Sequence, residues 1–385
     1  MTQEAPTLAL PRLGQGPAPT HISMPAPRRG RIAALDGLRL LAALMVVAYH
    51  YLARGEGWSA SGQAKFPTAF PFAAYGWLGV ELFFLISGFV ICMSCWGRSV
   101  GDFFVSRVTR LYPAYWFAVL ATTAVLLLIP GGQKPLPWPD VLTNLTMLQE
   151  PLGVRMVDGV YWTLFAELRF YLLFAVVAWW GLTYRRVLVF CCVWAVAGMA
   201  FSKFGDDAFR LMVMPNHCWY FIAGMAFYLM YRFRPTLLLT GIVLVCFGAA
   251  VPAARTTWSR TLGYFDHPIP FWPVIAVMAT CFGVMGLVAA GKLSWMTWRW
   301  LPYAGAATYP LYLLHQNIGW ELIRVLEPRV PAYALVGLLV GGMLLAAWLV
   351  HRLIERPLAR PLRRRLDRAL ADARDLGESH PPASR

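Results

Sequence analysis

Six ionisable side chains fall within stretches of sequence that are otherwise apolar: Arg39, His50, Glu81, Glu167, Arg169 and His315. A charged group inside a membrane helix costs about 2.5–3.5 kcal/mol on insertion scales, so such residues mark the place where function is expected. Neutral imidazole accepts a proton near physiological pH and can make a nucleophile of a hydroxyl group. The histidines therefore indicate general acid–base chemistry.

Arg39 and His50 are related by their spacing. His50 follows Arg39 by eleven residues, which on an α-helix is three turns plus about 20° and about 16 Å along the axis. The two side chains are expected on one helical face but at different depths.

The elements that must position these residues are membrane helices. The chain has 385 residues, of which 58% are hydrophobic and 14% charged, against about 25% charged in soluble domains. A span needs about 20 mostly apolar residues. Such runs lie at roughly 35–54, 75–95, 112–130, 160–180, 186–202, 211–231, 236–252, 271–290, 302–321 and 332–351. The sequence thus predicts an all-α polytopic membrane protein of about ten transmembrane helices.

The net charge of +15 is explained by where the basic residues lie. They cluster at alternate ends of the predicted spans, as at Arg28, Arg29 and Arg31 and at residues 352–365. The positive-inside rule then places both termini in the cytoplasm and the chain in the cell (cytoplasmic) membrane as a multi-pass protein. No nucleic-acid partner is needed to explain the charge.

Three regions follow from this topology. Residues 1–30, rich in Pro, Ala and Gly, are expected to form a disordered cytoplasmic tail. Residues 31–357 form the membrane domain. Residues 358–385 form a basic cytoplasmic tail, which either lies on the anionic leaflet or is solvated.

Counting residues inward from the helix ends puts four ionisable groups at a similar depth: His50, Glu81, Glu167 and His315. Simpler interpretations stay open. His315 could be an interhelical hydrogen-bond partner, and Glu167 a partner of Arg169. Trp162 and Tyr161 either bind substrate or belong to the aromatic belt at the interface.

Arg107 and Arg110 lie three residues apart in the segment SRVTRLYPAYW, just before the third predicted helix. Their spacing places both on one face of a helical turn, a fork suited to phosphate. Ordinary anchoring by the positive-inside rule is the alternative. No motif in the sequence implies a metal site.

Five segments together resemble the acyltransferase-3 family of integral membrane O-acyltransferases, from about Ala34 to Pro357. They are the R-x10-H pattern of Arg39 and His50, GWLGVELFFLISGFVI (76–91), RVTRLYP with Arg107, Arg110 and Pro113, YWTLFAE with Trp162 and Glu167, and TYPLYLLH with Tyr309, Tyr312, Leu313 and His315. Glu81 stands where an Asp is commoner. We expect no fused extracytoplasmic hydrolase-like domain at the C-terminus, which would leave the acceptor less constrained.

The resemblance implies transfer of an acyl group, expected to be acetyl, from acyl-CoA to a hydroxyl of a sugar-bearing acceptor. That acceptor would be a macrolide, another glycosylated natural product or a cell-surface glycan. Acyl-CoA is then a donor substrate, and no permanently bound cofactor is implied. The alternative class is a membrane transporter or exporter of a glycan or lipid-linked sugar.

The resemblance also assigns roles. Arg39, Arg107 and Arg110 are expected to bind CoA, and His50 is the expected base. Glu167 or Glu81 would orient the imidazole or the acceptor. Trp162, Tyr161 and His315 are the substrate-binding candidates. Direct transfer and an acyl-histidine intermediate both remain open.

Overall fold

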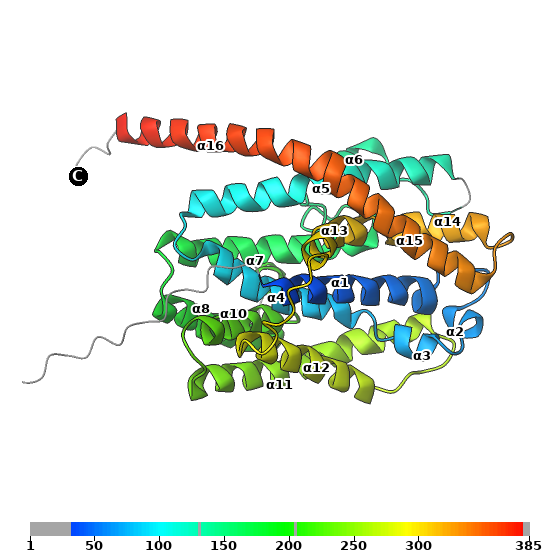
Figure 1. The fold of residues 1–385 in the computed structure, drawn as a ribbon, viewed down its shortest axis with the longest axis horizontal. Coiled ribbons are helices and arrows are strands. Elements are labelled where there is room, and N and C mark those ends of the chain that lie inside the picture. The colour runs from blue at the N-terminus through cyan, green and yellow to red at the C-terminus, as the bar shows by residue number, and fades with distance from the viewer. Residues whose placement is uncertain (1–31, 130–131, 204–205, 380–385) are drawn as a thin grey trace, which may run out of the picture. The chain divides into compact units, whose positions relative to one another are not determined.

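The computed structural model describes residues 32–129, 132–203 and 206–379, and the regular elements in these ranges are all helical (Figure 1). The all-α prediction is therefore confirmed for this part of the chain. The predicted N-terminal tail at 1–30 and the last six residues of the C-terminal tail lie outside the described residues.

Eight helical segments in the described ranges are long and apolar enough to cross a membrane. They are α1 (Ala33–Ala48) with η1 (Tyr49–Arg54), α3 (Phe70–Ala73) with α4 (Leu78–Cys95), α5 (Val100–Leu128), η2 (Gly159–Tyr161) with α7 (Trp162–Trp179), α8 (Tyr184–Lys203), α11 (Leu237–Thr261) with η3 (Leu262–Tyr264), α12 (Trp272–Ala289), and α15 (Ala332–Val350) with η4 (His351–Glu355) and α16 (Arg356–Ser379). The chain is thus a polytopic helical membrane protein.

The two remaining apolar runs form shorter helices. The run at 211–231 contains α9 (Asp207–Val213) and α10 (Cys218–Arg232), and the run at 302–321 contains α13 (Leu301–Leu314) and α14 (Gln316–Leu326). The count of ten spans and the cytoplasmic termini therefore stay predictions. Two short helices, α2 (Gly62–Lys65) and α6 (Trp138–Asn144), lie in the connections.

Helices α1 and α10 form the centre of the bundle. Helix α1 packs against α4 and α13, and α10 packs against α4, α8, α11 and α12. The α4–α10 crossing depends on small residues, because a Cβ atom at Gly88 would collide with the Phe221 backbone and one at Gly224 with the Leu85 carbonyl oxygen. Close backbone approach of this kind is a common way to associate helices in a bilayer.

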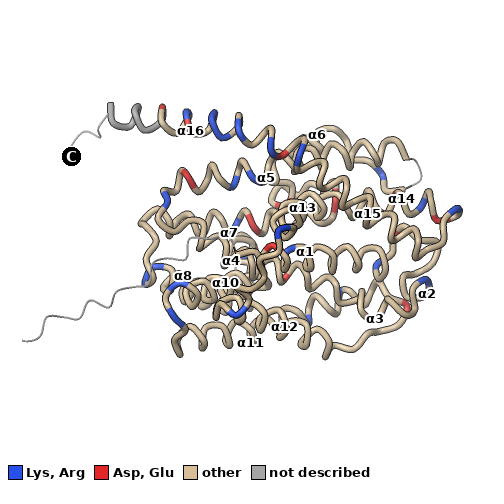
Figure 2. The backbone as a smooth tube through the Cα atoms, in the orientation of Figure 1, with Lys and Arg blue, Asp and Glu red and all other residues tan. Residues whose placement is uncertain are grey.

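Helix α5 begins twelve residues before the predicted run at 112–130. Ser99 caps it by accepting a hydrogen bond from the backbone N–H of Asp102 at 3.1 Å. Arg107 and Arg110 consequently lie inside the helix and not before it, which corrects the sequence-based placement. Figure 2 shows basic residues along this part of α5 and along α16, which packs against α5.

Two helices are irregular at the positions of the predicted histidines. Helix α1 changes to a π-helical segment at Tyr49, one residue before His50. Helix α13 ends at Leu314, and α14 starts at Gln316, so His315 occupies the interruption. π-Helical turns occur frequently at functional sites. Both irregularities therefore direct attention to the histidines.

Candidate functional site

The two histidines form a buried pair. Nε2 of His315 lies 3.1 Å from Nδ1 of His50, and the ring centroids are 5.0 Å apart. His315 is 0% exposed and His50 is 7% exposed. The sequence predicted both at a similar depth, and the structure brings them into direct contact.

The hydrogen bonds of the pair assign the neutral tautomers. Nδ1 of His315 donates to the Tyr312 carbonyl oxygen at 2.8 Å, which leaves Nε2 of His315 as an acceptor. Nδ1 of His50 faces that acceptor and also the Val46 carbonyl oxygen at 2.9 Å, so its proton is on Nδ1. The lone pair of neutral His50 is therefore on Nε2, the nitrogen that a general base would use.

Aromatic side chains hold both histidine backbones at the helix irregularities. The Tyr51 hydroxyl donates to the His315 carbonyl oxygen at 2.8 Å, and Nε1 of Trp320 donates to the His50 carbonyl oxygen at 3.0 Å. Tyr51 lies against Gly319, where a Cβ atom would collide with its hydroxyl group. Each irregularity is thus fixed by a buried donor from the other helix.

Asp158, which the sequence analysis did not select, fixes the start of α14. Its carboxylate is fully buried and accepts from the backbone N–H groups of Asn317 at 2.9 Å and Val160 at 3.1 Å. Burial raises the pKa of Asp158 to about 7, against the opposing effect of these two hydrogen bonds. The only sequence signal was an Asp just before a predicted helix.

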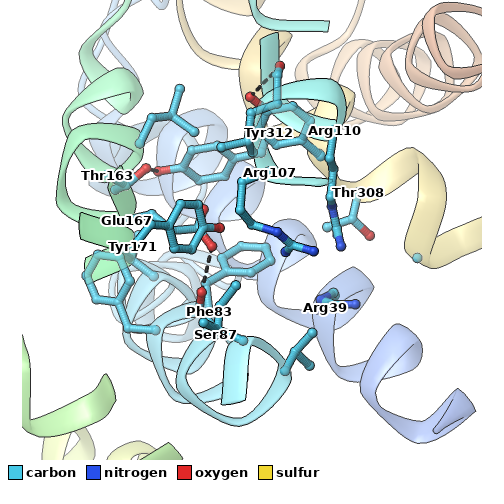
Figure 3. Close-up of a pocket in the computed structure, with 18 residues that line it drawn as sticks. Arg39, Phe83, Ser87, Arg107, Arg110, Thr163, Glu167, Tyr171, Thr308 and Tyr312 are labelled. Carbon is cyan, nitrogen blue, oxygen red and sulfur yellow. Dashed lines mark hydrogen bonds between the residues drawn. The ribbon is translucent and has the colours of Figure 1, made fainter. Parts of the chain in front are cut away.

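A cavity lies between α1, α4, α5, α7 and α13. It contains the three predicted cationic residues, Arg39, Arg107 and Arg110, together with Glu167. Figure 3 shows the guanidinium groups of Arg107 and Arg110 pointing toward Arg39. Three positive charges against one carboxylate make this cavity suited to an anion.

The polar groups of the cavity are only partly paired. Ser87 Oγ donates to Oε1 of Glu167 at 2.6 Å (Figure 3), and Arg39 lies 3.6 Å from the Asp36 carboxylate. Arg107 donates to Ser106 Oγ at 2.8 Å, while its buried Nε has no hydrogen-bond partner within the described residues. A phosphate oxygen would satisfy such a group.

Tyr312 connects the cavity to the histidine pair. Its ring lines the cavity, its hydroxyl lies 3.0 Å from Thr163 Oγ1, and its carbonyl oxygen accepts from His315. The Tyr312 and His315 ring centroids are 5.7 Å apart. Tyr312 and His315 thus connect the anion-binding groups to His50, the candidate base.

The structure places the other predicted residues away from the histidine pair. Glu81 faces His217, with Oε1 3.8 Å from its Nδ1. Arg169 pairs with Glu150 at 3.7 Å, so the suggested Glu167–Arg169 pair does not form. Tyr161 is fully buried, with its hydroxyl 3.5 Å from the Leu313 carbonyl oxygen, whereas Trp162 is partly exposed beside His217.

Comparison with known proteins identifies the family. Residues 32–352 match the model of the acyltransferase domain that defines the acyltransferase-3 family. The chain belongs to this family. No solved structure matches this chain.

Several curated proteins are similar to parts of this chain. Acyltransferase MdmB of Streptomyces mycarofaciens is 31% identical over 184 residues, which cover 45% of each chain. A putative peptidoglycan O-acetyltransferase, YrhL of Bacillus subtilis, is 31% identical over 25% of this chain and 14% of its own length. Nodulation protein 10 of Rhizobium leguminosarum is 28% identical over 71% of each chain. The match therefore spans less than half of the first two relatives.

Proposed function

We propose that this acyltransferase moves an acyl group, expected to be acetyl, from acyl-CoA to a hydroxyl of a sugar-bearing acceptor. The observation that carries the proposal is the arginine-lined cavity joined through Tyr312 to a buried histidine pair with its lone pair on Nε2 of His50. An anionic donor and a base for a hydroxyl acceptor are the two requirements of such a transfer.

In this proposal the cavity holds the donor. Arg107, Arg110 and Arg39 bind phosphate oxygens of CoA, since planar guanidinium groups match them in charge and geometry. Glu167, which accepts a hydrogen bond from Ser87 Oγ, orients the arginines or the pantetheine amides. The thioester then points along the cavity toward Tyr312.

The chemical step uses His50. Its Nε2 removes the proton of the acceptor hydroxyl while the hydroxyl oxygen attacks the thioester carbonyl carbon. The tetrahedral intermediate collapses with loss of the CoA thiolate, which recovers the proton from Nε2. In the acyl-histidine alternative, Nε2 attacks the carbonyl carbon and expels the CoA thiolate; the acceptor oxygen later attacks the acyl group and displaces the imidazole, whose Nε2 takes the hydroxyl proton. His315 supports both routes because it holds the Nδ1 proton of His50 in place.

The acceptor class and the sidedness are supported by the relatives and the charges. A macrolide, another glycosylated natural product or a cell-surface glycan would each present a sugar hydroxyl. We place the N-terminal end of α1, with Arg39, at the cytoplasmic face of the cell membrane, where acyl-CoA is available.

The test is label transfer from radioactive acetyl-CoA in membranes that contain the wild type, His50→Ala, or His267→Ala. His267 is an exposed loop histidine and serves as the matched control. The membranes are supplied with glycosylated macrolides and glycan oligomers. Loss of a positioned base costs about 10²–10⁴ in rate, so we expect label on one acceptor class with wild type and His267→Ala only.

Two results would contradict the proposal. Transfer by His50→Ala at the wild-type rate and equal abundance would remove the base assignment. Absence of label on every acceptor, together with uptake of a labelled glycan by wild-type vesicles, would favour the transporter class.

A further inference from the structure

A second group of polar side chains lies where α4, α7 and α10 begin, apart from the arginine-lined cavity. Glu81 is in the first turn of α4, Trp162 is the first residue of α7, and His217 precedes the first residue of α10. Trp77 lies one helical turn before Glu81 and so shares its face of α4. We call Trp77, Glu81, Trp162 and His217 the α4–α7–α10 cluster.

Three polar atoms of the α4–α7–α10 cluster are buried and unpaired. Oε2 of Glu81, Nδ1 of His217 and Nε1 of Trp77 have no hydrogen-bond partner among the described residues. Glu81 is only 5% exposed, and its other oxygen is 3.8 Å from His217, too far for a hydrogen bond. Burying such groups without partners is costly, so their grouping indicates a ligand that completes their bonds.

An aromatic wall accompanies these atoms. The Trp162 ring lies 5.0 Å and the Phe84 ring 5.5 Å from the His217 ring. The side chain of His217 is 21% exposed, so solvent reaches the edge of the cluster, and the three unpaired atoms lie beneath it. Phe84 also lines the arginine-rich cavity, so its ring separates the two sites.

Glu81 is not arranged to orient His50. Gly76, just before α4, and Gly79, in its first turn, approach Met45 and Ala42 of α1, the helix that leads to His50. Glu81 follows Gly79 by two residues, about 200° further round the helix, and meets His217 at the start of α10. The carboxylate therefore belongs to a separate site.

We propose that the α4–α7–α10 cluster binds a sugar ring of the acceptor. A sugar hydroxyl donates to Oε2 of Glu81, the ring oxygen accepts from Nε1 of Trp77, and an apolar face of the ring packs on Trp162. Nδ1 of His217 bonds a neighbouring hydroxyl. This subsite rests on the proposed function, because it would supply the acceptor to the histidine pair. A glycosylated macrolide and a polymeric glycan both carry the sugar ring that the subsite would recognise.

The test is binding to the purified full chain in lipid nanodiscs without acyl-CoA, measured by isothermal titration. The probes are a glycosylated macrolide, its aglycone, and an N-acetylglucosamine tetramer. The variants are Glu81→Gln and Trp162→Leu, with Glu56→Gln and Trp272→Leu as controls at exposed positions of the same residue types. The first two probes separate recognition of the sugar from recognition of the lactone, and the third identifies a polymeric acceptor.

We expect one glycosylated probe to bind wild type and both controls equally, and the aglycone to bind at least tenfold more weakly. A hydrogen bond to a charged group corresponds to about tenfold or more in affinity, so Glu81→Gln should weaken binding by at least that factor. Trp162→Leu removes the aromatic surface on which the sugar packs and should weaken binding by about three- to tenfold. Should Glu81→Gln be misfolded by size-exclusion chromatography, His217→Gln is measured instead, with an expected loss of about three- to tenfold.

Unchanged affinity in these variants, or no binding of either glycoside to wild type, would overturn the subsite. His50→Ala separates this result from the proposed function, because it should bind the glycoside as wild type does. Binding that depends on Glu81, found with a wild type that transfers no label, would keep the subsite and reject the acyltransfer proposal.

Discussion

The arginine-lined cavity makes a quantitative prediction about the donor. Arg110→Ala removes one of the three guanidinium groups of the cavity, while Arg98→Ala removes an exposed arginine near the start of α5. If Arg110 binds a CoA phosphate, the substitution should raise KM for acetyl-CoA and leave KM for the acceptor unchanged. Arg98→Ala should change neither constant.

The magnitude follows from the type of contact. A hydrogen bond between two charged groups contributes about 1.5–3 kcal/mol net, which is about 10- to 100-fold in KM for acetyl-CoA. Arg107→Lys should lose less, about 3- to 10-fold, because lysine keeps the charge but not the planar fork. The increase in KM for acetyl-CoA caused by Arg110→Ala should also become larger when the ionic strength is lowered, because the positive charge then attracts the anionic donor over a longer range.

The assay compares two donors, each with the wild type and with Arg110→Ala. Acetyl-CoA carries the phosphates, whereas acetyl-N-acetylcysteamine carries the same thioester without them. Arg110→Ala should lose 10- to 100-fold in kcat/KM with the first donor and less than about twofold with the second. An equal loss with both donors would refute the reasoning, because Arg110 would then act on the thioester or on the fold and not on a phosphate.

Three further outcomes are expected. His315→Phe removes the Nε2 acceptor for Nδ1 of His50 but leaves the Val46 carbonyl oxygen, so kcat should fall about tenfold at unchanged KM for acetyl-CoA. A loss of kcat as large as that of His50→Ala would contradict a positioning role for His315. Gly319→Ala displaces the Tyr51 hydroxyl and should destabilise the fold by about 1–3 kcal/mol in thermal unfolding, whereas Gly341→Ala, with open space around its Cβ, should not. The raised pKa of Asp158, about 7 against 3.8 for the free group, means that the folded state binds the proton more tightly than the unfolded state. The stability of wild type relative to Asp158→Asn should therefore fall by about 1.4 kcal/mol per pH unit between pH 4 and 7. A stability difference that does not change with pH would be inconsistent with this burial.

The helical membrane fold and the family were predictable because they depend on long-range averages of sequence. Apolar runs and the order of five motifs are still recognised when the predicted helix boundaries are wrong by a few residues. Contacts between particular side chains do not. Glu81 and Glu167 were both placed near the depth of His50, but depth does not define the direction in which a helix presents its side chain. In the structure Glu167 lies in the cavity beside Ser87, and Glu81 lies beside His217.

The residues that the sequence analysis missed show the same limit. His217 falls inside the predicted run at 211–231 and meets the criterion that selects His50. Its significance depends on Glu81 being next to it, which sequence spacing cannot show. Asp158 reads as an ordinary loop residue until the backbone of Asn317, 159 positions further on, is seen to donate to it.

The histidine pair explains why irregular helices are maintained at this site. A regular α-helix in a bilayer satisfies its own backbone, so an interruption requires donors and acceptors from elsewhere. Here Tyr51 bonds the His315 carbonyl oxygen, Trp320 bonds that of His50, and Asp158 accepts from the first turn of α14. These contacts tie the two irregular segments to each other as well as to the fold, so the same bonds that make the interruptions stable also set the distance between His50 and His315. A substitution that restored regular helix at either position would therefore be expected to separate the two rings, even if it made the protein more stable.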